Sequence, residues 1–136
     1  MPGQSSKGDS DGWVRRYRGD ALLRWTRQFG TKDADGVVGL DPGAERVYVS
    51  GFSYGAFAGL TNKGATDAFV TSYSCTGARR WTRQMGTAGY DGASGIALGI
   101  PPGDSQQADR RGLYVGGGLN AFLSFDERAY VRKYEE

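Results

Sequence analysis

The strongest constraint on the fold is a heptapeptide that occurs twice in the chain. Residues 25–31 read Trp-Thr-Arg-Gln-Phe-Gly-Thr, and residues 81–87 read Trp-Thr-Arg-Gln-Met-Gly-Thr, 56 residues later. An ungapped superposition of residues 3–36 on residues 59–92 gives 15 identities in 34 positions. A fixed period of this length indicates a repeat architecture, in which each unit packs against its neighbours.

Short strands are predicted throughout the repeat. Residues 13–17, 69–73 and 130–134 all read aromatic, Val, polar, polar, Tyr, and this alternation is typical of a strand. The 23 glycines and few long apolar runs favour turns between short strands, and no helix is expected. The full set of predicted strands is 13–17, 22–29, 37–40, 47–52, 68–73, 78–85, 95–98, 113–117 and 129–134, with the short apolar strand at 37–40 matched to 95–98.

Four hairpin-connected strands per period describe one blade of a β-propeller, so the predicted fold class is all-β. We name the short apolar strand A and the three that follow it B, C and D. The chain then reads as strands C and D of one blade (11–30), a full blade (36–86) and strands A, B and C of the next (95–134). Residues 1–10 are predicted to form a repeat-derived loop in the same single domain, which holds about two and a quarter blades.

Several segments carry a resemblance to a known family. Residues 67–73, 80–87, 95–97 and 113–115 resemble the bacterial seven-bladed β-propeller repeat family, and the resemblance covers nearly the whole chain except the insert at 101–111. It implies a propeller scaffold and a secreted or cell-surface parent protein. It brings no catalytic residues, and the chain itself does not indicate a compartment.

Completeness is the next expectation. Closing a propeller takes roughly four to eight blades, so about two blades must leave their faces bare. Exposed aromatic faces require a partner. The chain is therefore expected to be a fragment or subunit of a larger propeller or complex, with a homo-oligomeric ring as the alternative. Strand C at both ends and a start inside a repeat loop favour the fragment or subunit.

Most catalytic chemistry is excluded by composition. The chain has no histidine and one cysteine, Cys75, so a Ser-His-Asp triad, a Cys-His pair and an intramolecular disulfide are impossible. Residues 33–36 resemble the start of a calcium loop, but the second copy keeps only one carboxylate and a turn is predicted. The expected function is a non-enzymatic scaffold or binding module without cofactor or metal, and a glycosidase-related fragment with a carboxylate pair stays an alternative.

Candidate contact residues lie at two places. Trp25 and Trp81 could stack on sugars in a lectin-like module, or could recur because blades pack on each other. An eleven-residue polar insert breaks the repeat between predicted strands A and B of the last blade, and it is predicted to be a contact surface. Its candidate contacts are Pro101, Pro102, Asp104, Arg110 and Arg111. A net charge of +2 does not favour nucleic acid, the arginine clusters are expected to be solvated, and no apolar run is long enough to span a membrane.

Overall fold

The computed structural model describes residues 3–43, 45–99, 112–119 and 128–135. These residues form β-strands and no helix, which confirms the all-β prediction, and each strand overlaps its predicted range. The strands are β1 (Gly12–Tyr17), β2 (Leu23–Phe29), β3 (Asp35–Pro42), β4 (Arg46–Ser53), β5 (Asp67–Ser74), β6 (Arg79–Met85), β7 (Gly92–Gly99), β8 (Gly112–Leu119) and β9 (Arg128–Glu135).

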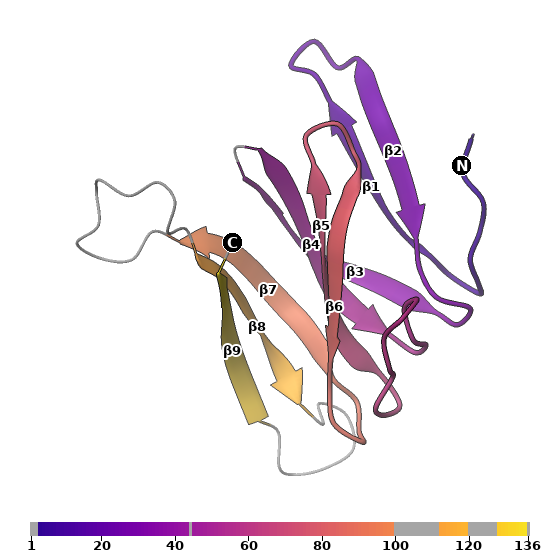
Figure 1. Ribbon diagram of the computed structural model, residues 1–136, viewed down its shortest axis with the longest axis vertical. Helices are drawn as coiled ribbons and strands as arrows, with labels where there is room; N and C mark the ends of the chain where they lie inside the picture. The colour runs from indigo at the N-terminus through magenta and orange to yellow at the C-terminus, as the bar shows by residue number, and fades with distance from the viewer. Residues whose placement is uncertain (1–2, 44, 100–111, 120–127, 136) are drawn as a thin grey trace.

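The strands form three antiparallel sheets that follow one another along the chain (Figure 1). β1 and β2 form the first sheet, β3 to β6 the second, and β7 to β9 the third. Within each sheet every strand pairs with its sequence neighbour, because short turns suffice to reverse an antiparallel chain. This grouping into two, four and three strands is the one that the 56-residue period predicts.

The period also appears in the backbone irregularities. The register shifts between residues 16 and 17 in β1 and between 72 and 73 in β5, and the same holds for 37–39 in β3 and 93–95 in β7. Gly3 and Gly59 both adopt positive φ, 70° and 76°, a conformation that glycine tolerates at little cost.

One predicted match is corrected by these bulges. Leu40 pairs with Val49 and Ile96 pairs with Val115, so Leu40 corresponds to Ile96 and the spacing of 56 residues holds in β7 as well. The sequence-based match of 37–40 to 95–98 was therefore out of register. The apolar pattern alone does not reveal which residue a bulge leaves unpaired.

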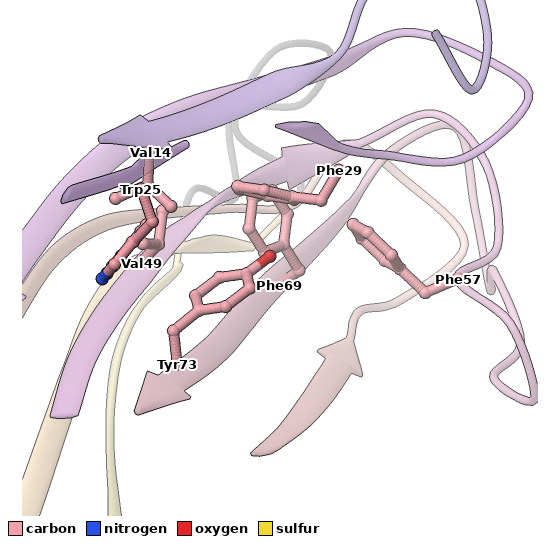
Figure 2. Packing of buried hydrophobic residues seen from close by; sticks show 7 residues of the cluster. All are labelled: Val14, Trp25, Phe29, Val49, Phe57, Phe69 and Tyr73. Atoms are coloured by element: carbon pink, nitrogen blue, oxygen red, sulfur yellow. The ribbon is translucent and has the colours of Figure 1, made fainter. Parts of the chain in front are cut away.

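The second sheet lies between the other two and packs on both. The first core joins the β1–β2 hairpin to one face of the second sheet (Figure 2). Its buried members are Val14, Trp25, Phe29, Val49, Phe57, Phe69 and Tyr73. The second core joins the opposite face to the third sheet, with Tyr48, Ala68, Val70, Met85, Ala93, Leu113 and Val115 as its buried members. Residues on the two faces of β5 therefore alternate between the two cores, as the pleat of a strand requires.

Aromatic rings dominate the first core. The Phe69 ring lies 5.9 Å from that of Phe29 and 5.2 Å from that of Phe57, both in edge-on geometry. Edge-to-face pairs add about 0.5–1.5 kcal/mol to the burial of the rings themselves. The core thus fixes the first sheet against the second although the first has only two strands.

Candidate interaction surface

One edge of β1 is open. In the second sheet, β5 pairs with β4 along one edge and with β6 along the other. Its repeat counterpart β1 pairs only with β2 among the residues that the structure describes. The N–H and C=O groups along the other edge of β1 therefore present a row of donors and acceptors to a further strand.

A groove of about 330 Å³ lies beside this edge, between β1 and the β3–β4 hairpin. Its apolar lining comes from Val14, Tyr17, Leu40, Pro42 and Val47, its basic side from Arg15, Arg16 and Arg46, and Gly43 and Cys75 complete it. The volume is at the lower end of the range for small-molecule pockets and accommodates a bulky side chain.

The wall of the groove formed by β3 is bare where its counterpart is covered. Val37 is 39% exposed, whereas its repeat counterpart Ala93 is 1% exposed. Leu40 is 50% exposed, whereas its counterpart Ile96 packs against the second core, to which Tyr48 of β4 belongs. The second sheet covers these positions in the third sheet, and no described residue covers them in the second. We call Val37, Val38 and Leu40 the open flank.

The outer face of the first sheet shows the same contrast. Trp13 and Tyr17 are 53% and 52% exposed, and their counterparts Phe69 and Tyr73 are almost fully buried against the first sheet. Leu23, which pairs with Tyr17, is also half exposed. Exposed aromatic and aliphatic residues grouped in this way are typical of an interaction surface. We call Trp13, Tyr17 and Leu23 the outer face.

Arginines give the groove a basic margin. The guanidinium of Arg16 donates to the backbone carbonyl of Cys75, which also accepts the indole N–H of Trp25 at 2.9 Å. The guanidinium of Arg15 lies over the Trp13 ring at 5.7 Å, and its Nε is buried without a hydrogen-bond partner among the described residues. The groove therefore combines apolar walls with donors at its rim.

Neither of the two predicted tryptophans lies on these surfaces. Trp25 is buried in the first core, 6.3 Å from the Tyr73 ring. Trp81 is partly buried against the second core, where its ring lies 6.2 Å from those of Tyr48 and Tyr134. This packing favours the interpretation that the repeated tryptophans hold neighbouring sheets together. The predicted contacts Pro101, Pro102, Asp104, Arg110 and Arg111 lie outside the described residues.

Two pairs of aspartates recur at the ends of the sheets. In the second copy, Oδ2 of Asp67 accepts the backbone N–H of Lys63 at 3.0 Å, and Oδ2 of Asp91 accepts that of Thr87 at 2.6 Å. A Cβ atom at Gly86 would overlap Oδ1 of Asp67 and lie 2.8 Å from Oδ2 of Asp91. Glycine at this position therefore lets two carboxylates approach the same backbone.

The first copy repeats this arrangement. Asp11 and Asp35 accept the backbone N–H groups of Lys7 at 2.8 Å and Thr31 at 2.6 Å, and both border Gly30. In each copy one oxygen, Oδ1 of the first aspartate, is buried without a hydrogen-bond partner. The pairs close the loops that precede β1, β3, β5 and β7, and neither pair lines the groove.

Burial changes the protonation of these pairs. Burial raises the pKa of Asp67, and the nearby charge of Asp91 adds to the rise. Burial likewise raises the pKa of Asp35, with a smaller contribution from Asp11. For Asp11 itself burial is outweighed by hydrogen bonds from Lys7, Gln28 and Ser6, which lower its pKa. The described residues contain no group of three or more Asp, Glu, Cys or His side chains placed to hold a metal ion.

The turn predicted at 33–36 is consistent with these contacts, because Asp35 bonds to Thr31 of the same loop. Trp13 and Leu40 were not singled out by the sequence analysis. Their signal was nonetheless present in the repeat: Trp13 aligns with Phe69, and an interior position at the first sheet has no earlier sheet to cover it.

Comparison with known proteins adds no name to this geometry: no protein-family model matches the chain, and no curated protein matches it. The part of the chain that the structure describes contains no helix that could cross a lipid bilayer.

Proposed function

We propose that this chain is a set of β-propeller-type blades that acts as a non-enzymatic scaffold or assembly module and associates with further β-structure. The 56-residue period, the meander order within each sheet and the face-to-face stacking of the sheets support this. The proposal includes the likeness to the bacterial propeller repeats. A further blade in a larger propeller or complex is the favoured partner, and copies of the chain joined in a ring are the alternative.

One observation carries the proposal: identical repeat positions are buried or exposed according to whether a neighbouring sheet is present. Phe69 is 0% exposed with the first sheet before it, and Trp13 is 53% exposed with none. Full burial of a large aromatic side chain stabilises by about 1.5–3 kcal/mol relative to leaving it in water. The outer face therefore gains substantially from a protein partner of complementary shape.

Light scattering after size-exclusion chromatography tests this, with the purified chain measured from low to high micromolar concentration. We expect mass to increase with concentration, because the outer face and the open flank are unpaired in isolation. The double variant Trp13→Ser/Tyr17→Ser should shift association to higher concentration. Tyr54→Ser is the matched control, because Tyr54 is 46% exposed and lies outside both surfaces. A folded monomer at every concentration would contradict the proposal.

A further inference from the structure

The groove beside β1 has an internal template for what fills it. Strand β4 pairs with β5 from Arg46 opposite Ser74 to Ser53 opposite Asp67. In the second core, the Tyr48 side chain on that strand is 1% exposed and packs toward the third sheet with Leu113 and Val115. A β3–β4 hairpin therefore does two things at once: it pairs with a C strand and covers the next sheet.

We propose that the groove is the docking site for a β-hairpin of the same type as β3–β4, whose second strand pairs with the open edge of β1 and whose tyrosine at the Tyr48 position enters the groove. The inference rests on the proposed function and names the partner: an A–B hairpin of this repeat type from a neighbouring blade. Shifted by the 56-residue period, the pairing places the docked strand opposite residues 11–18.

The apolar walls fit this occupant. A tyrosine at the Tyr48 position would meet Leu40 and Val47, as Tyr48 packs with their counterparts Ile96 and Leu113. The hairpin pattern also carries Asp41, whose carboxylate accepts the backbone N–H of Leu98 at 2.9 Å in the second core. The counterpart of Leu98 is Pro42, which has no N–H, so the docked carboxylate would meet the arginine rim instead.

An unsatisfied group independently indicates the same partner. Oε1 of Gln84 accepts the backbone N–H of Phe57 at 3.0 Å, in the loop that follows the β3–β4 hairpin. Oε1 of its counterpart Gln28 is buried and has no hydrogen-bond partner among the described residues. A buried acceptor without a donor costs about 1–3 kcal/mol. A loop following a docked hairpin would supply the equivalent donor.

The test supplies the hairpin within the chain. Residues 35–58 are duplicated and inserted between Pro2 and Gly3, which reproduces the natural junction of Ala58 with Gly59 and the spacing from Phe57 to Gln84. We expect the urea midpoint to rise by about 1 M, because more apolar surface is buried in the folded state. We also expect alkylation of Cys75 to slow by about tenfold, since reaction requires access to the thiol. Cys75 is the only cysteine and remains so in the extended chain.

Two variants control the result. Tyr48→Asp in the inserted copy alone should abolish both effects while the parent sequence stays intact. Leu40→Asp in the original copy should change the unextended chain little, because Leu40 is half exposed, and should cancel the gain in the extended chain. Equal midpoints and equal Cys75 reactivity for the extended and unextended chains would overturn the inference.

The outcome also separates this inference from the function on which it rests. If the extended chain behaves like the original but the original still associates through Trp13 and Tyr17, the hairpin site is wrong and the assembly role stands. If the original chain is monomeric at all concentrations and the hairpin changes nothing, both fail.

Discussion

Replacing Asp67 by asparagine should stabilise the protein at neutral pH, although it removes a fully buried hydrogen-bonding side chain. Oδ1 of Asp67 has no hydrogen-bond partner, and it borders the same Gly86 position as Oδ2 of Asp91. The two oxygens lie at most about 5 Å apart, and at an effective dielectric constant of about 20 two negative charges at this distance repel by about 3 kcal/mol.

Asparagine removes this repulsion and keeps the useful contacts. Its carbonyl oxygen can accept from Lys63 and Gln84, as Oδ2 of Asp67 does, and its amide can donate toward Asp91. Loss of the charge on the accepting oxygen offsets about 1 kcal/mol of the gain. We therefore expect Asp67→Asn to raise the free energy of unfolding by about 1–2 kcal/mol at pH 7.

The effect should depend on pH with a defined sign. The pKa of Asp67 in the folded protein is raised above the usual 3.8, so the folded state binds more protons than the unfolded state between these two values. Wild-type stability from this group is therefore complete below about pH 4 and is lost as the pH rises through the raised pKa. The difference between Asp67→Asn and wild type should be near zero at pH 3 and reach its full size by pH 7.

Urea unfolding followed by tryptophan fluorescence at pH 3, 4, 5, 6 and 7 measures this difference. Asp11→Asn is the matched control, because Asp11 occupies the equivalent position but hydrogen bonds lower its pKa, so its ionised form is favoured. That variant should gain nothing at pH 7. If Asp67→Asn is less stable than wild type at pH 7, or equally offset at pH 3 and pH 7, the repulsion argument is refuted.

Three further predictions test the packing. Phe69→Ala should lower the free energy of unfolding by about 3–5 kcal/mol, because the ring is 0% exposed between the first two sheets; a loss below 1 kcal/mol in urea unfolding would be incompatible with that core. Gly86→Ala should cost about 1–3 kcal/mol through overlap with two carboxylates, whereas Gly95→Ala, with no atom within 4 Å of the added methyl group, should change stability by less than about 0.5 kcal/mol; the reverse order would contradict the geometry. Burial raises the pKa of Tyr73 to about 12, so one tyrosine should ionise last in an absorbance titration, stability from this group should fall as pH rises from 10 to 12, and the late step should be missing in Tyr73→Phe.

Much of the secondary structure could be predicted because strands have a local signature. Alternating aromatic and polar residues in 13–17 and 69–73, turns rich in glycine, and a repeat of 56 residues specify where strands begin and end. The same information predicted the sheet grouping, because consecutive antiparallel strands pair through short turns. It did not predict the register of β7, because bulges at Val38 and Ser94 depend on pairing between strands.

The candidate surface was predicted only in outline. The repeat indicated that some blade faces would be bare, but it pointed to Trp25 and Trp81 as contacts, and the structure buries the first and partly buries the second. Both tryptophans follow the same local pattern as exposed strand residues. A side chain's exposure depends on whether another sheet lies against its face, and a local pattern does not contain that information.

The sequence by itself therefore determined the strands, their order and the period, because hydrophobic alternation and turn chemistry act between residues close in the chain. Only the tertiary structure decided that Phe69 is buried while Trp13 is exposed, that Leu40 and Val47 line a groove beside β1, and that two carboxylates share the space at Gly86. Each of these depends on contacts between segments far apart in sequence, and burial, packing and electrostatic repulsion arise at such contacts.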